Sequence, residues 1–288
     1  MTALRSEGLL PGGLVEGGAR TRTYAFRPLD GAVELALGEV VVDAPSLPVA
    51  VTRALCATLA TLGDAPASAE RVDALCVADR QFLMRELQCL CDASTRWLVA
   101  TCAVCGERFD LEVDLRALPV TPAPAPFPLA SGTHDGRVWH ARLPTGADQA
   151  WLARADAASL GNDDVGGDDK DIADLETRLM QRLLLDGTDP HLSENPATPG
   201  LREAVEAALD AVAPGVVTTL GAPCPVCGQV NAVTTDPYER LGTGLDDLLR
   251  QVYALASHYH WSEADILRLP RSRRHAYLAL LDTAVETA

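Results

Sequence analysis

The chain has 288 residues, 48% of them hydrophobic, so it can bury the core of one or two ordinary domains. Its formal net charge of −16 repels phosphate backbones and argues against general binding of nucleic acid. The sequence shows neither a basic start before a long apolar stretch nor a run of about 20 apolar residues, so we expect no signal peptide, no membrane contact and a cytoplasmic location.

The first recognisable element is a strand-and-turn segment that the chain contains twice. Residues 24–31 read YAFRPLDG and residues 139–146 read WHARLPTG, so each copy has an aromatic-led strand, then an arginine, then a turn that ends in glycine. The spacing from the arginine to the glycine is the same in both copies. Because proline fixes φ and glycine permits positive φ, both segments predict a tight exit from a strand.

Helices are expected after each of these turns, from apolar residues at helical spacing. They span roughly 48–62 and 69–91 in the first copy and roughly 147–160, 171–185 and 200–212 in the second. A strand and a CxxCG motif follow in both copies. The second copy is longer by about the length of the acidic segment GNDDVGGDDK at 161–170, which we interpret as a loop insertion.

Both ends of this unit recur in the same order at nearly equal separation, so we interpret the chain as an internal duplication. The expected fold is α+β, with a duplicated unit of hairpin, helices and zinc knuckle and a small C-terminal helical region. The predicted boundaries are an N-terminal tail over 1–23, repeat unit 1 over 24–118, a proline-rich linker over 119–137, repeat unit 2 over 138–236 and the helical region over 237–288.

Four cysteines in the two CxxC motifs carry the strongest chemical signal. They are Cys102 and Cys105 in the first motif and Cys224 and Cys227 in the second, and each pair is followed by glycine and flanked by strand-like sequence. Two cysteines in such a tight turn can present both sulfurs to one ion, and zinc takes four such ligands in a tetrahedron. The pattern predicts one structural Zn²⁺ ion shared by both knuckles, with no open coordination position for catalysis.

Two other roles for these cysteines stay open from the sequence. A thioredoxin-like redox site places its CxxC at the start of a helix, whereas strands are expected on both sides here. Disulfides within each pair, or free thiols, are the other alternative, and disulfides are rare in a reducing cytoplasm. The remaining cysteines lie in apolar helical stretches and are expected to pack as small apolar side chains: Cys56, Cys76, Cys89 and Cys91.

The C-terminal region predicts three short helices, the second of them capped by Ser262. The last helix opens with Arg271, Arg273 and Arg274, and cations at the start of a helix oppose its dipole. We interpret these arginines, together with Trp261, as a docking surface for an acidic partner. A solvated start of the helix is the alternative interpretation.

No familiar catalytic pattern accompanies these features. The sequence contains no GxSxG elbow, no GxGxxG pattern and no P-loop, and its acidic run lacks the spacing of a calcium loop. We therefore expect a protein that is not an enzyme.

Four segments carry a wider resemblance, in the same order over most of the chain. They are LPGGLVEGG…YAFRPLDG over 10–31, ADRQFLMREL over 78–87, HARLPTGADQAWL over 140–152 and HWSEADILRLPRSRRHAYL over 260–278. Together they resemble the baseplate hub assembly chaperone family, whose members are found in contractile phage tails and in related extracellular contractile injection systems. The RLPTGADQ stretch and the C-terminal segment are the most specific parts.

The resemblance implies a non-enzymatic assembly factor or structural component of the baseplate, with hub or wedge proteins as its partners. It transfers no functional residue to this chain. The alternative function is a zinc-ribbon adaptor or regulator that binds transcription machinery or nucleic acid, and the acidic net charge and the lack of a basic stripe argue against it.

Overall fold

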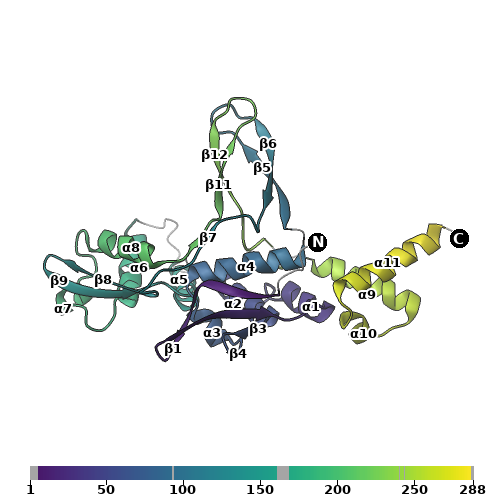
Figure 1. Ribbon diagram of the computed structural model, residues 1–288, viewed down its shortest axis with the longest axis horizontal. Coiled ribbons are helices and arrows are strands. Elements are labelled where there is room, and N and C mark those ends of the chain that lie inside the picture. Colours follow the sequence, from purple (N-terminus) through teal and green to yellow (C-terminus); the bar gives the residue numbers. More distant parts are fainter. Residues whose placement is uncertain (1–5, 93, 161–168, 240, 243, 287–288) are drawn as a thin grey trace.

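The computed structural model is elongated, with a ribbon-like arm that projects from its middle (Figure 1). It describes residues 6–92, 94–160, 169–239, 241–242 and 244–286. Helices and small antiparallel sheets make up these residues, which confirms the expected α+β class.

The middle of the molecule is a four-stranded antiparallel sheet covered by helices. Its strands, in the order of pairing, are β1 (Glu7–Glu16), β2 (Ala19–Phe26), β3 (Leu59–Leu62) and β4 (Ala65–Pro66). Its helices are α1 (Gly31–Glu39), α2 (Leu47–Thr58), α3 (Ala69–Ala74) and α4 (Val77–Cys91). Two helix predictions need correction, because residues 59–62 pair with β2 as a strand and an extended break at Leu75 and Cys76 separates α3 from α4.

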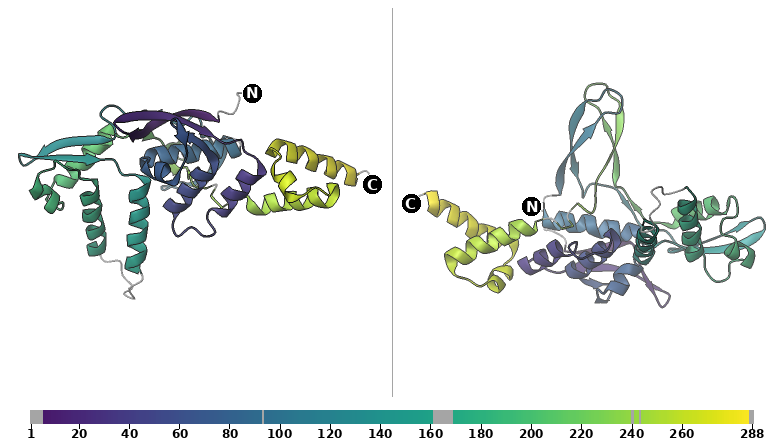
Figure 2. Two further views of the ribbon diagram at one scale, coloured as in Figure 1. Left: turned by 90° about the horizontal axis from the view of Figure 1, so that it is seen from below. Right: turned by 180° about the vertical axis from the view of Figure 1, so that it is seen from behind.

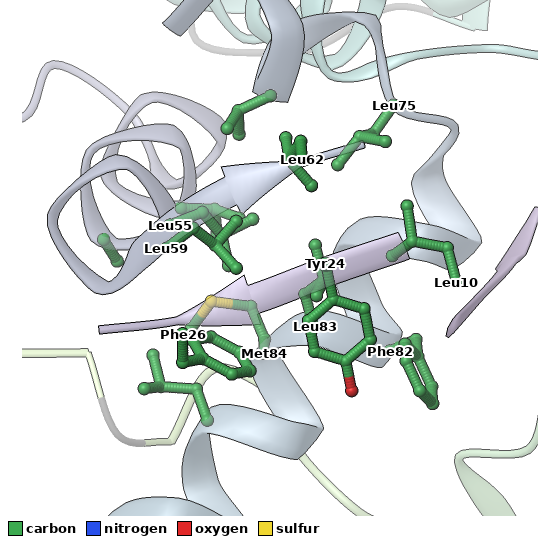
Figure 3. Close-up of a cluster of buried hydrophobic side chains, with 14 of the residues drawn as sticks. Leu10, Tyr24, Phe26, Leu55, Leu59, Leu62, Leu75, Phe82, Leu83 and Met84 are labelled. Carbon is green, nitrogen blue, oxygen red and sulfur yellow. The ribbon is translucent and has the colours of Figure 1, made fainter. Parts of the chain in front are cut away.

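An apolar core joins this sheet to α4 (Figure 3). Tyr24 and Phe26 stand two positions apart on β2, so both point to the same face of the sheet, where each is 4% exposed. Leu55, Leu62 and Met84 meet them from α2, β3 and α4 and have no exposed surface. Each such side chain contributes about 1.5–3 kcal/mol of hydrophobic stabilisation.

The expected N-terminal tail over 1–23 is wrong, since β1 and most of β2 lie within it. Leu10 and Leu14 on β1 are buried in the core. The buried carboxylate of Asp79 on α4 accepts hydrogen bonds of 2.7 Å from the backbone N–H groups of both Gly12 and Gly13. These bonds fall where the pairing of β1 with β2 shifts register, so α4 satisfies backbone groups that the sheet leaves unpaired.

The four-stranded sheet with α1 to α4 is the first, central body, and the C-terminal helices form a third. The second body lies at the end of the molecule opposite the C-terminus (Figure 1). Its strands are β8 (Leu129–His134) and β9 (Arg137–Arg142), and its helices are α5 (Gly146–Leu160), α6 (Asp169–Leu183), α7 (Pro190–Glu194) and α8 (Leu201–Val212). The short strands β7 (Val120–Thr121) and β10 (Gly215–Val216) pair with each other at the base of the arm, where Val120 and Val216 pack against the core of the central sheet. Trp139 on β9 packs among Leu201, Val205 and Leu209 of α8 in the core of the second body. The expected linker over 119–137 is therefore shorter, because it contains β8, which pairs with β9. Of the acidic stretch 161–170, residues 161–168 lie outside the described residues.

The two bodies share an order of elements. In each, a hairpin precedes helices, a last helix packs on the first strand of the hairpin, and a second hairpin carries the CxxC motif: α4 packs on β1, and α8 packs on β8. In the second body, Leu184 forms a single backbone pair with Ala141 of β9. The first body has the longer strand β3 paired with β2 at the corresponding place. The internal duplication itself stays a prediction.

The arm consists of two antiparallel hairpins that come from distant parts of the chain and lie side by side (Figures 1 and 2). They are β5 (Thr95–Thr101) with β6 (Arg108–Asp114), and β11 (Thr219–Pro223) with β12 (Val230–Thr234). Leu98, Leu111 and Leu220 pack at the base of the arm against a cluster that includes Cys89 of α4.

The C-terminal helices are α9 (Leu245–Tyr259), α10 (Glu263–Leu267) and α11 (Arg271–Glu286). Ser262 caps α10 as expected, since its side chain accepts a hydrogen bond from the backbone N–H of Asp265. An aromatic cluster joins the helices, in which Trp261 stacks on Tyr259 with ring centroids 4.8 Å apart and meets Tyr277 edge-on.

Two turns, one after β9 and one after β2, each contact a helix elsewhere in the chain. The turn after β9 contacts the start of α4. Thr145 pairs with Cys76 at the start of α4, and a Cβ on the neighbouring Gly146 would overlap the guanidinium of Arg80. A larger residue at position 146 would force the buried guanidinium of Arg80 to shift. The adjoining helix α5 packs on α2 and α3.

The other turn repeats this contact with the C-terminal helices. Asp30 pairs with Pro270 before α11, and a Cβ on Gly31 would lie 2.9 Å from a guanidinium nitrogen of Arg274. The adjoining helix α1 packs on α9 and α10. Arg80 and Arg274 are 1% and 0% exposed, so one kind of arginine-backed contact joins all three bodies.

In the turn after β9, residues 142–148 (RLPTGAD) form an ion-pair cluster. The carboxylate of Asp148, 1% exposed, accepts hydrogen bonds from the guanidinium of Arg142 at 2.5 and 3.0 Å, from the backbone and hydroxyl of Thr145, and from Arg182 of α6. Burial works to raise the pKa of this carboxyl, but the hydrogen bonds from Arg142 and Thr145 outweigh it and lower the pKa to about 2.

Candidate metal centre

Each CxxC motif folds into the same knuckle at the tip of the arm. In the first, the backbone N–H of Gly106 donates to the carbonyl of Cys102 at 3.0 Å, and the N–H of Cys102 donates to the carbonyl of Glu107 at 2.8 Å. The corresponding bonds from Gly228 and within the second hairpin measure 2.9 and 2.8 Å. Both turns therefore close on their own backbone.

The glycine after each motif is required by the backbone. Gly106 and Gly228 have φ of +73° and +74°, in the left-handed region that side chains disfavour. A Cβ at either position would meet nothing within 4 Å, so the requirement comes from backbone conformation and not from crowding.

The four sulfur atoms converge between the two hairpins, all within 4.8 Å of one another. Two of the separations cross from one hairpin to the other: Cys102 Sγ lies 3.6 Å from Cys227 Sγ, and Cys105 Sγ lies 3.7 Å from Cys224 Sγ. A tetrahedron of sulfurs around an ion at about 2.3 Å has edges of about 3.8 Å. The four cysteines therefore form a cluster that can hold one metal ion.

This geometry bears on the alternatives for these cysteines. None of the eight cysteines forms a disulfide, and the sulfurs of this cluster lie far beyond the disulfide bond length of about 2.05 Å. Both motifs stand between two strands of a hairpin, unlike the helix start of a thioredoxin-like site. Outside the cluster, Cys76, Cys89 and Cys91 are buried and Cys56 is half-buried.

Backbone N–H groups and the neighbouring thiols set the protonation of the cluster. The backbone N–H groups of Cys105 and Val104 donate toward Cys102 Sγ and lower the pKa of that thiol to about 6. For Cys105, the N–H of Glu107 acts to lower the pKa, but burial and the neighbouring sulfurs outweigh it and raise the pKa to about 12. A metal ion displaces thiol protons, so binding will release protons.

The inner sides of the hairpins surround the cluster with small and apolar groups. Cys102 and Cys224 are each 2% exposed and pack with Ala100, Phe109 and Ala222, whereas the second cysteine of each motif is exposed. The cluster therefore has a dry inner side and an outer side at the tip of the arm.

Asn231 is a residue of this site that sequence reasoning missed. Its side-chain oxygen accepts a 3.0 Å hydrogen bond from the backbone N–H of Ala103, and its amide donates to the carbonyl of Gln229. At the matching positions of the other knuckle, Pro225 has no N–H and Phe109 has no polar side chain. The only available signal was a polar residue at an inward-facing strand position.

The residues expected to form a docking surface are only partly available. Arg274 has no exposed surface and pairs with Glu34 at 2.6 Å, so the docking prediction is wrong for this residue. Arg271 donates to the backbone carbonyl of Cys91 and lies 3.6 Å from Asp92, and Trp261 packs in the aromatic cluster. Arg273 is exposed.

Comparison with protein-family models, curated proteins and solved structures finds no match for this chain. Within the described residues, none of the helices has the length and apolar character that a membrane span requires. Among the described residues, the four-cysteine cluster is the group of side chains that could hold a metal ion.

Proposed function

We propose that this chain is a non-enzymatic assembly factor or structural component of the baseplate of a contractile tail or injection system, and that one Zn²⁺ ion stabilises its arm. The observation that carries the metal part is the convergence of Cys102, Cys105, Cys224 and Cys227 within 4.8 Å. The baseplate part is supported by the four segments that resemble the hub assembly chaperone family.

Zinc fits the donor set better than other common ions. Four thiolates in a tetrahedral arrangement select zinc or iron, whereas magnesium and calcium require oxygen ligands. Four protein ligands leave no position for a water molecule or a substrate, so the ion in such a site is structural.

The position of the ion gives it a specific structural task. Cys105 and Cys224 are 119 positions apart, and each belongs to a hairpin of only two strands. Isolated two-stranded hairpins are marginally stable in water. A shared ion ties them together and with them the two bodies from which they emerge, because structural metal binding is folding free energy.

The family segments coincide with contacts that build the long axis of the molecule. HARLPTGADQ contains the turn that docks on α4, and the C-terminal segment contains Arg274, which backs the turn at Gly31. A chain whose three bodies are joined by such contacts suits a role in assembly. Hub or wedge proteins of the baseplate are the proposed partners.

The test is to purify contractile particles from cells that express a tagged form of the chain, and to quantify it in particle and soluble fractions by mass spectrometry. A fixed ratio to baseplate proteins identifies a structural component. Recovery only in the soluble fraction, bound to hub or wedge proteins, identifies an assembly factor. Absence from both, with unchanged particle yield after deletion, would overturn the baseplate role.

A zinc-ribbon adaptor is the second candidate, and the two-hairpin geometry of the arm favours it. Binding of the chain to transcription proteins, with no interaction with tail proteins, would select it. Salt-sensitive binding of DNA would also do so, against the expectation from the net charge.

A further inference from the structure

The outward face of the first hairpin of the arm carries two contrasting stripes. On β5, the exposed side chains include Trp97 and Val99, at 68% and 59% exposure. On β6, Glu112 stands directly opposite Trp97 and Asp110 directly opposite Val99, and both acids are exposed. An apolar stripe and an acidic stripe therefore lie side by side on one face of a two-stranded sheet.

Trp97 differs from the other tryptophans of the chain. Trp139 is 2% exposed in the core of the second body, Trp151 lies under two arginine guanidinium groups, and Trp261 stacks in the aromatic cluster. Trp97 alone among the four is largely exposed. Tryptophan is enriched at interface hot spots, because it offers a large rigid surface that gains from desolvation.

The acidic stripe has no cation assigned to it. No ion pair joins Asp110 or Glu112 to a described residue. Arg108 lies on the same strand and the same face, two positions from Asp110 and nearer the tip, where it stands opposite Thr101. The charges of this stripe are thus available to a partner.

The second hairpin has the same knuckle but lacks such an outward face, so the knuckle does not require one. Its outward side chains are small or uncharged: Thr219, Pro223, Val230, Ala232 and Thr234, with Gly221 between them. The hairpins build the same knuckle, yet only the first displays an aromatic side chain beside carboxylates.

We propose that the outward face of β5 and β6 docks a segment of a partner protein in which lysine or arginine side chains stand beside apolar ones. The apolar side chains cover Trp97 and Val99, and the cations meet Glu112 and Asp110 about 5 Å away across the strands. Complementary charge favours such a partner and opposes a second copy of this chain, whose net charge is −16. Phosphate-bearing partners are opposed for the same reason.

The test uses the full-length zinc-loaded protein and two synthetic peptides, one of alternating lysine and valine and one of alternating glutamate and valine. Backbone amide and tryptophan indole N–H resonances are followed by NMR during titration. We expect the lysine peptide to shift the resonances of Trp97, Val99, Asp110 and Glu112, with affinity that falls as salt is raised, and the glutamate peptide to shift none.

Matched variants separate this face from general attraction to an acidic protein. Trp97→Thr should weaken binding about tenfold, whereas Val230→Thr on the other hairpin should leave it unchanged. Asp110→Asn with Glu112→Gln should weaken binding and flatten its salt dependence. Glu203→Gln with Asp210→Asn, which removes two exposed charges from α8, should not.

Shifts confined to other surfaces, or equal affinities for Trp97→Thr and the parent protein, would overturn the proposal. So would self-association through Trp97 in sedimentation equilibrium, or preferential binding of a DNA oligonucleotide at this face. The proposal does not require the baseplate role. Failure of peptide binding in a chain that still joins tail proteins removes only the docking face, and the reverse result removes only the baseplate role.

Discussion

The backbone N–H of Ala103 donates a 3.0 Å hydrogen bond to the side-chain oxygen of Asn231, and so ties one knuckle directly to the other. Apart from the sulfur contacts, it is the one side-chain hydrogen bond that joins the two hairpins within the part of the chain that the structure describes. Asn231 is 8% exposed, so water replaces this bond poorly.

Asn231→Leu should therefore destabilise the arm by about 1–3 kcal/mol, because it leaves the N–H of Ala103 without an acceptor. Amide hydrogen exchange of residues 95–114 and 219–234 measures this effect. Ala232→Leu adds the same side chain at the next, exposed position of β12 and serves as the control. Equal exchange in both variants would show that the bond contributes nothing.

Metal removal should loosen both hairpins together. We expect one zinc ion per chain, and chelation should lower the melting temperature by about 10 °C or more while amide exchange rises in both hairpins. Cys102→Ser and Cys224→Ser should each release the ion although they lie in different hairpins, and the double variant should add little to either. Cys56→Ser, outside the cluster, should retain it. Retention of zinc by one single variant would contradict a shared site.

Replacing a knuckle glycine should destabilise the arm only through its backbone conformation. Gly228→Ala should destabilise the arm by about 1 kcal/mol, since φ is +74° and the space beside the residue is empty. Gly228→Asn should cost less, because asparagine tolerates the left-handed region better than alanine. Thermal unfolding of the zinc-loaded variants ranks the three proteins, and a cost for asparagine equal to that for alanine would point to crowding instead.

Local sequence patterns predicted the knuckles well because each is a short turn defined by its own residues. Cys102 and Gly106 close one hydrogen bond within five positions, so spacing alone indicates the geometry. The convergence of two knuckles required only the chemical argument that four thiolates suit one ion. Asn231 escaped prediction because its partner, Ala103, is 128 positions away.

The N-terminal strand was missed for a related reason. Gly12 and Gly13 look like a flexible tail in sequence, yet Asp79 holds both of their N–H groups from another element. A local similarity between two segments was missed as well. Residues 68–80 and 262–274 each begin with a capping serine and end with a buried arginine at the same spacing, but almost every residue between differs. Only the two docked turns make the equivalence visible.

The ion-pair cluster around Asp148, in the turn after β9, should make the free energy of unfolding depend on pH. The pKa of Asp148 is lowered to about 2 in the folded protein, against about 3.9 in an unfolded chain. A lowered folded pKa gives stability that is present above pH 4 and is lost as the pH falls toward 2. Asp148→Asn should therefore cost about 1–2 kcal/mol at pH 7, a figure reduced because Arg142 and Arg182 are partly exposed.

Denaturant unfolding of the parent protein and of Asp148→Asn across this range measures the difference. The gap should narrow between about pH 5 and pH 2. Asp174→Asn alters an exposed carboxylate on α6 and should give a gap near zero throughout. A constant gap for Asp148→Asn would show that the hydrogen bonds stabilise the protonated carboxyl equally well.

The ion pair of the fully buried Arg274 with the partly buried Glu34 should hold the C-terminal helices to the central body. Arg274→Met keeps the bulk of the side chain but leaves Glu34, 16% exposed, without its cation, and strands the carbonyl of Leu269. We expect a loss of about 3 kcal/mol in the docking of residues 245–286, seen as faster proteolysis between the central body and α9. Adding Glu34→Gln to Arg274→Met should restore part of this loss, because an unpaired buried charge is then removed. If the double variant is cleaved as fast as Arg274→Met, the loss comes from packing around Gly31 and not from the charge of Glu34.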